Sequence, residues 1–155
     1  MPKILIVKAN YFATNVPSYE SAKDLLEKTE EEIADLFVLN LWVIFERFVR
    51  NYLQQKGMAL QKHVQPPEFG EALYQYFNEE VDSWNPKEVL DKLLKTGIFK
   101  NENGKKLIGS AKQILAYRNW VAHKNPKKKP SIKILPKTAY DTLNEIIETL
   151  LQHYP

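Results

Sequence analysis

The chain has 155 residues, of which 44% are hydrophobic and 26% are charged, and it carries no cysteine. This length and composition indicate one folded domain with a sizeable core and exclude a disordered chain. The lack of cysteine excludes a disulfide framework and any metal site with Cys ligands, and it suits the reducing cytoplasm, where we expect the protein to act.

The first elements in the chain are a short strand and a long helical region. Residues 3–8, "KILIVK", are predicted to form the strand, because the run is short and rich in β-branched residues. It is far too short for a signal peptide or a membrane span. Residues 19–56 contain no Pro or Gly, which predicts one long helix or two helices with a kink near residues 29–33. The part over 36–53, "LFVLNLWVIFERFVRNYL", is apolar on almost all sides and is therefore predicted to be the central helix.

The middle of the chain is predicted to hold two shorter helices. One is expected over residues 69–82, after the chain-breaking "QPPEFGE". The next begins with Asn85 as N-cap, Pro86 at the first helical position and Glu88 completing a capping box. Gly97 is expected to end it.

The last third is predicted to hold a turn, a helix, a second strand and a final helix. "NENGKK", residues 101–106, reads as the turn, and the helix follows over 105–123. "SIKIL", residues 131–135, reads as the second strand. The final amphipathic helix covers 137–153, with these side chains expected inward: Tyr140, Leu143, Ile147, Leu150 and Tyr154.

These elements predict a single all-α domain over residues 1–155. Its architecture would be an antiparallel bundle of four to five helices, with at most one small two-stranded β element. The segments "FVLNLWVIFERFV" and "LIGSAKQILAYRNWVAH" are expected to pack against each other.

The end of the penultimate helix, "LAYRNWVAHKNP", carries the candidate chemistry. On a helix, Arg118 and Asn119 are about 100° apart and His123 lies about 140° from Arg118, so all three fit on one broad face. Arg118 also lies on or beside the inward stripe, where an unpaired charge is costly, so it must be paired or must serve a ligand.

Arginine and histidine together are suited to cutting RNA without a metal. The guanidinium of Arg118 can hold a phosphate in a bidentate grip, and the imidazole of His123 can act as general base and general acid near neutral pH. No cofactor is implied. The histidines are far apart and no acid cluster accompanies them, so we expect no metal site.

The hexapeptide "RNWVAH" resembles the Arg-Asn-x-x-x-His signature of the HEPN superfamily, and the resemblance covers roughly residues 20–154. It implies an all-α HEPN-like fold and a metal-independent endoribonuclease that leaves a 2′,3′-cyclic phosphate. It also implies that Glu46 is the acid facing the Arg-His helix and that Asn119 orients Arg118 or the phosphate.

The resemblance further implies a homodimer in which two Arg118–His123 ends meet near the two-fold axis and form one composite site. In the toxin branch that is paired with nucleotidyltransferase antitoxins, a tyrosine follows the His after one residue. Asn125 stands at that position, so the sequence does not imply that partnership, and any antitoxin or regulator stays unnamed.

A basic loop follows His123, within a chain whose formal net charge is +3. Next to a cleavage site such a loop can bind an RNA backbone, and the candidate RNA-binding residues are Lys124, Lys127, Lys128, Lys129 and also Arg50. A solvated loop is the alternative. The acidic "EKTEEEIAD", residues 27–35, lies far upstream, so the chain is electrostatically polarised.

Each candidate residue also has a purely structural interpretation, which the sequence leaves open. Arg118 could simply pair with Glu46 while His123 caps its helix, and Glu46 could instead pair with Arg50 at i, i+4. Trp120 fits packing or base stacking. The function classes left open are an RNA-cleaving enzyme, a silent interaction module that binds RNA, a nucleotide or a protein, and a structural helical dimer.

Overall fold

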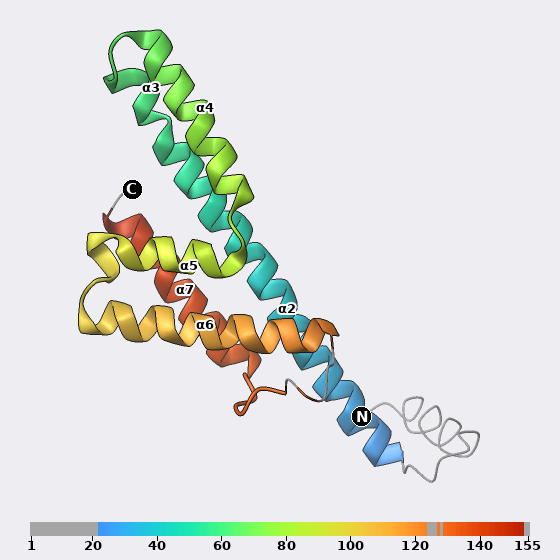
Figure 1. The fold of residues 1–155 in the computed structure, drawn as a ribbon. Coiled ribbons are helices and arrows are strands. Elements are labelled where there is room, and N and C mark those ends of the chain that lie inside the picture. Colours follow the sequence, from blue (N-terminus) through green and yellow to red (C-terminus); the bar gives the residue numbers. More distant parts are fainter. Residues whose placement is uncertain (1–21, 124–126, 128, 154–155) are drawn as a thin grey trace.

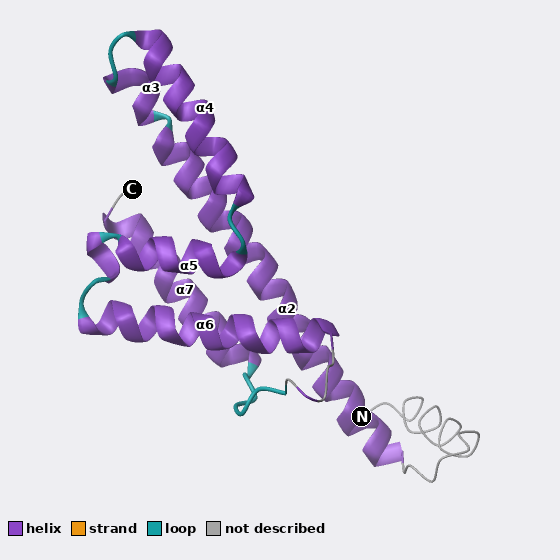
Figure 2. Ribbon diagram, viewed as in Figure 1, coloured by secondary structure: helices purple, strands orange, loops and turns teal. Residues whose placement is uncertain are grey.

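The computed structural model describes residues 22–123, 127 and 129–153, and this part of the chain is an all-α bundle without strands (Figure 2). In chain order the elements are α2 (Ala22–Gly57), α3 (Ala59–His63), α4 (Pro67–Ser83), α5 (Pro86–Lys95), the 3₁₀ turn η1 (Gly97–Phe99), α6 (Glu102–His123) and α7 (Pro136–His153). None of the described helices is both long enough and apolar enough to cross a membrane.

Helix α2 is the central element, as the sequence predicts, and it is continuous through residues 29–33. Its first half crosses α6, and its second half contacts α7, where the Tyr52 hydroxyl donates to the Leu150 carbonyl, before it continues as an arm with α3 and α4 (Figure 1). Helices α5 and α6 lie side by side and run in opposite directions, joined by η1. The expected packing of the central helix against α6 is therefore confirmed.

The core forms where α2, α5, α6 and α7 meet. Its largest fully buried side chains include Trp42, Phe45, Phe99 and Ile114. On α2 the buried positions recur every three or four residues, which places them on one face of the helix. The opposite face of α2 keeps large apolar side chains exposed, so this helix is central without being buried all round.

The capping box of α5 is confirmed in full. Asn85 Oδ1 accepts a hydrogen bond from the Glu88 backbone N–H at 3.0 Å, and Glu88 Oε2 accepts one from the Asn85 N–H at 2.8 Å. Pro86 occupies the first turn. The helix ends at Lys95, before Gly97, with the Thr96 hydroxyl donating to the Leu93 carbonyl.

Two predictions between residues 101 and 135 are wrong. Five of the six residues of the expected turn at 101–106 belong to α6, because Asn101 Oδ1 accepts a hydrogen bond from the Gly104 N–H at 2.7 Å and so caps the helix at its first residues. The expected strand at 131–135 is a loop: Ile134 is buried in the core while Ile132 is exposed. A strand needs a partner for its backbone groups, and the candidate partner at 3–8 lies outside the described residues.

The inward face of α7 is rotated from the predicted one. Leu143 and Leu150 are buried as expected, but the face is completed by Ala139 and Ile146. Tyr140 is 52% exposed, which contradicts the prediction, and Ile147 is only partly buried at the edge of the core. Tyr154 lies outside the described residues.

The start of α6 yields a stability prediction with a control on the same helix. A Cβ at Gly104 would lie 2.5 Å from the Phe99 Cα and 2.7 Å from its carbonyl carbon, so the backbone of η1 would have to shift. We expect Gly104→Ala to lower the free energy of unfolding by about 1–3 kcal/mol, measured by urea titration. Gly109→Ala meets nothing within 4 Å and should instead raise it by about 0.5–1 kcal/mol. Equal effects of the two substitutions would contradict this packing.

Candidate functional site

The end of α6 presents the three residues of the predicted constellation together. Arg118 is half-buried, whereas Asn119 and His123 are exposed. Arg118 Nη1 donates a hydrogen bond to Asn119 Oδ1 at 3.0 Å, so these two side chains lie in direct contact. Asn119 and His123 are four residues apart and therefore neighbours on the helix surface.

The Arg118 guanidinium is only partly hydrogen-bonded by the described residues. Its Nε is buried and has no hydrogen-bond partner among the described residues. Because this Nε is enclosed, an anion at the end of α6 would contact the guanidinium through its Nη groups, of which Nη1 is at the exposed bond to Asn119. A phosphate presents two oxygens that can accept parallel hydrogen bonds from two N–H groups of a guanidinium.

Glu46 is bonded to Arg50 rather than to Arg118. Glu46 Oε1 accepts from Arg50 Nη2 at 2.7 Å and from Nε at 3.1 Å, and Glu46 Oε2 accepts from Trp42 Nε1 at 3.0 Å. Both charged side chains are at least four-fifths buried. Among the described residues no hydrogen bond or ion pair joins Glu46 to Arg118, so the i, i+4 alternative describes this pair and Glu46 is not placed at the α6 site.

Arg50 is also engaged away from the α6 site. Its Nη1 and Nη2 donate to the backbone carbonyls of Val81 and Trp84, at the junction of α4 and α5. With Glu46 also bound, every nitrogen of the guanidinium has an acceptor. Arg50 thus ties α2 to the α4–α5 junction and has no free edge for an RNA phosphate.

The basic loop is only partly described. Lys124, Asn125 and Lys128 lie outside the described residues, and Lys127 is exposed. Lys129 Nζ lies 5.9 Å from the ring centroid of Trp120, within cation–π range. The structure therefore places at least one of the predicted RNA-binding lysines against α6.

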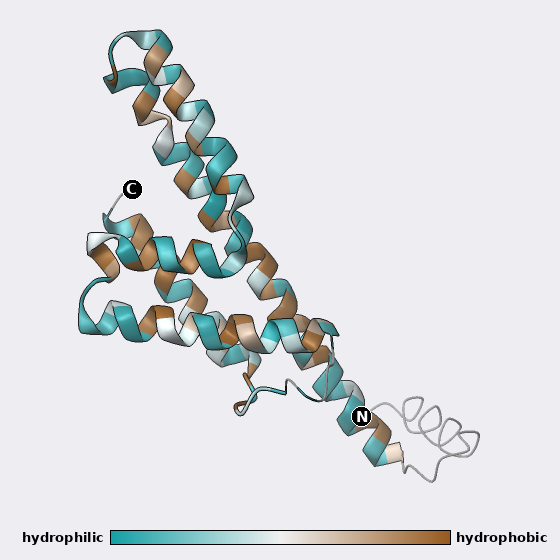
Figure 3. Ribbon diagram, in the orientation of Figure 1, coloured by the Kyte–Doolittle hydropathy of each residue, from teal (hydrophilic) through white to brown (hydrophobic). Residues whose placement is uncertain are grey.

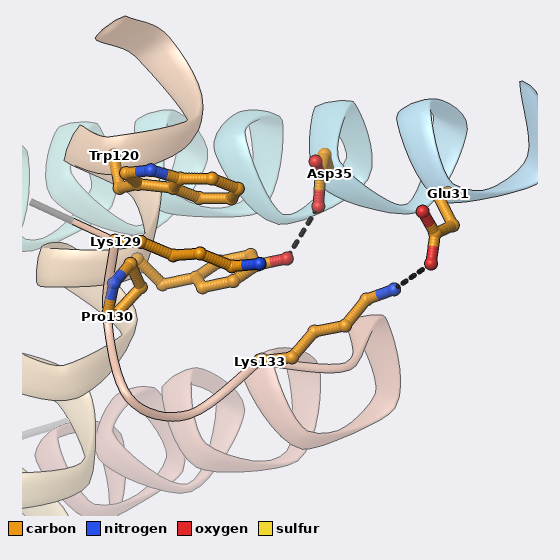
Figure 4. Close-up of a pocket in the computed structure, with 7 residues that line it drawn as sticks. Glu31, Asp35, Trp120, Lys129, Pro130 and Lys133 are labelled. Carbon is orange, nitrogen blue, oxygen red and sulfur yellow. Dashed lines mark hydrogen bonds and ion pairs between the residues drawn. The ribbon is translucent and has the colours of Figure 1, made fainter. Parts of the chain in front are cut away.

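A pocket that the sequence reading did not predict lies beside this loop. It has a volume of about 210 Å³ between α2, α6 and the loop, and it is lined by Glu31, Asp35, Tyr117, Trp120, Lys129, Pro130 and Lys133 (Figure 4). Lys133 closes one side through an ion pair with Glu31 at 2.8 Å. Trp120 and His123 are three residues apart on α6, so the pocket begins one helical turn from the histidine.

The floor of this pocket is a buried polar pair. The Tyr117 hydroxyl donates to Asp35 Oδ1 at 2.6 Å, and Asp35 is only 8% exposed. A signal for it existed in the sequence, because Asp35 falls on the same stripe of α2 as Val38 and Trp42. An acid on a buried stripe requires a donor, but the identity of that donor, 82 residues away, could not be read from the sequence.

The buried phenol predicts a pH dependence of stability. Burial first, and then the hydrogen bond to Asp35, raise the pKa of Tyr117 well above its ordinary value of 10.0. The folded state therefore holds this proton more tightly than the unfolded state, so the contribution is complete below about pH 10 and is lost as the pH rises further. We expect Tyr117→Phe to reduce the loss of unfolding free energy between about pH 9 and pH 11, by up to about 1.4 kcal/mol per pH unit above pH 10. Parallel stability curves for the two proteins would contradict it.

Metal ligands do not cluster in the part of the chain that the structure describes, where no group of three or more His, Asp or Glu could hold an ion. Searches of protein-family models, of curated proteins and of solved structures found no match to this chain. A function is therefore inferred from the geometry at the end of α6 and from the sequence motif.

Proposed function

We propose that the protein is a metal-independent endoribonuclease of the HEPN type, with Arg118 and His123 as its catalytic residues. The observation that carries the proposal is the half-buried Arg118 guanidinium, whose exposed Nη1 is held by a hydrogen bond to Asn119 at the end of α6. His123 is exposed at the end of the same helix, where substrate can reach it.

In the proposed reaction, the His123 imidazole takes the proton of a ribose 2′-OH. The 2′-oxygen then attacks the adjacent phosphorus, and the bond from phosphorus to the 5′-oxygen breaks. The imidazolium returns its proton to the leaving 5′-oxygen, so the products are a 2′,3′-cyclic phosphate and a 5′-hydroxyl. Arg118 binds the phosphate oxygens, on which charge builds up in the transition state.

Lys127 and Lys129, on the loop that follows, supply positive charge for a polyanionic strand. Lys129 lies against Trp120, so a cation for the RNA backbone and an aromatic ring for a base lie next to each other. Binding to this loop is expected to weaken as salt rises, because phosphate contacts release counterions.

The proposal is tested by incubating the full chain with mixed RNA in excess EDTA. Wild-type protein should cut the RNA and leave 2′,3′-cyclic phosphate ends, which are resolved by mass spectrometry. Cutting that EDTA abolishes would contradict the metal-independent mechanism. If wild-type protein binds RNA but leaves it intact, the silent interaction module takes the place of the enzyme.

The composite site remains a prediction from the resemblance. Among the described residues, α6 contributes none of the exposed large apolar side chains, so the surface around Arg118 and His123 is polar. Mixing the Arg118→Ala and His123→Ala proteins tests the composite site directly, because only a shared site would regain activity.

A further inference from the structure

The outer face of α2 carries an apolar surface that the bundle does not use. Its members are large side chains that are between 38% and 65% exposed: Leu26, Ile33, Leu36, Phe37, Val43 and Ile44. Figure 3 shows apolar residues continuing along the middle of α2. Monomeric proteins rarely expose a contiguous apolar surface of this kind without a partner for it.

The exposed face has the spacing of a helix–helix seam. Steps of four and three residues alternate along it, and every position in the series is exposed: Leu26, Glu30, Ile33, Phe37, Asn40, Ile44, Arg47 and Asn51. This is the spacing of the a and d positions of a coiled coil, with four of the eight positions apolar and with Leu36 and Val43 as flanking positions on one side. We call these eight residues the α2 seam.

We propose that the α2 seam pairs with the α2 seam of a second copy of this chain, in antiparallel orientation about a two-fold axis. The charges on the seam select both the occupant and the direction. Antiparallel pairing with the axis between residues 38 and 39 places Glu30 beside Arg47 of the second copy, and Arg47 beside its Glu30. Parallel, in-register pairing would place Glu30 against Glu30 and Arg47 against Arg47, which is repulsive.

The same register also brings one pair of apolar positions together. Ile33 meets Ile44 of the second copy, and Phe37 packs next to Asn40 at the layer closest to the axis. The seam spans about 38 Å of helix at 1.5 Å per residue. That length suits an interface of about 800 Å² on each copy, the size that stable dimers use.

This pairing is independent of the proposed RNA cleavage. The hydrogen bond between Asp35 and Tyr117 shows that α6 packs on the buried face of α2, opposite the seam. Two copies joined through the seam therefore keep their Arg118–His123 ends on opposite sides, so this dimer does not form the composite site that the resemblance implies. Loss of the dimer and loss of cleavage can thus be observed separately.

The first test is the mass of the full chain in solution by size exclusion with light scattering. Wild-type protein should be a dimer of the 18.1 kDa chain at micromolar concentration, and Ile44→Glu and Phe37→Glu should each be monomers with unchanged helical content. Tyr76→Glu is the matched control, because Tyr76 is 64% exposed on α4 and lies outside the seam. A wild-type monomer, or an Ile44→Glu protein that is still a dimer, would overturn the proposal.

The second test measures the direction of pairing. Glu30→Arg and Arg47→Glu should each raise the dimer dissociation constant by about tenfold, since each breaks two symmetric ion pairs. Combining both substitutions restores the pairs only in antiparallel orientation. A double variant weaker than either single variant would overturn this orientation.

Cysteine substitutions give the register independently, since the chain has no native cysteine. A mixture of Ile33→Cys and Ile44→Cys proteins should form a covalent heterodimer with a short bis-maleimide. Each protein alone should stay uncrosslinked, because identical positions would be about 16 Å apart along the pair. Efficient crosslinking of Ile33→Cys alone would instead indicate parallel pairing and overturn the proposed register.

Discussion

His123→Ala is expected to slow RNA cleavage by about 10²–10⁴-fold, the usual contribution of general acid–base catalysis. The RNA dissociation constant and the melting temperature should change little. The imidazole is exposed at the end of α6, so its removal opens no cavity, and it moves protons without supplying much binding energy. Cleavage is measured in single-turnover reactions in EDTA, and binding is measured on a 2′-O-methyl RNA, which cannot be cut. The two measurements separate the effect on catalysis from the effect on binding.

His153→Ala is the matched control for this experiment. His153 is also an exposed histidine in the last turn of a helix, and its Nδ1 lies 2.9 Å from the carbonyl oxygen of Thr149, on its own helix. Its substitution should leave cleavage unchanged. If the two variants and the wild-type protein cut RNA equally, the activity belongs to a contaminant.

Arg118→Ala should behave differently from His123→Ala, because Arg118 contacts the phosphate before and during the reaction in the proposed mechanism. Both RNA binding and cleavage are expected to fall. Lysine should not rescue the site, since an ammonium cannot reproduce the bidentate grip or the hydrogen bond to Asn119 at the same geometry. An Arg118→Ala protein that binds and cuts normally would leave the guanidinium with a structural role only.

The elements predicted best are those determined by local chemistry. The capping box at Asn85 and Glu88 joins residues three apart, and the uninterrupted helical pattern of α2 needs no distant partner. The failures depend on tertiary packing. Whether residues 131–135 form a strand depends on a pairing partner, and the rotation of α7 depends on which stripe meets α2 and α6.

The candidate site was likewise predicted where local contacts decide the geometry and missed where tertiary packing decides it. The bond between Arg118 and Asn119 joins neighbouring residues, so a helical wheel was enough to place them together. The sequence left Glu46 two possible partners, Arg118 and Arg50. In the structure Arg50 also donates to the carbonyls of Val81 and Trp84, and these tertiary contacts hold it beside Glu46. No periodicity in α2 contains that information, because both carbonyls come from residues more than 30 positions away.

Arg50→Ala is expected to lower the free energy of unfolding by about 2–4 kcal/mol. Among the described residues, the substitution leaves the mostly buried Glu46 carboxylate with the Trp42 indole as its remaining donor, and it frees two carbonyls at the end of α4. Unpaired groups of this kind cost more than the pair contributes when intact. Urea titration should show the loss, with Lys106→Ala, an exposed cation on α6, within about 0.5 kcal/mol of wild type.

The same variant decides whether Glu46 and Arg50 belong to the reaction or to the scaffold. Arg50→Lys should recover only part of the stability, because one ammonium cannot reach Glu46 and both carbonyls at once. At a temperature where the variant stays folded, cleavage of RNA should match wild type, since no bond links this pair to Arg118 among the described residues. If Arg50→Ala retained full stability yet lost cleavage, Arg50 and its partner Glu46 would return to the catalytic site that the resemblance implied.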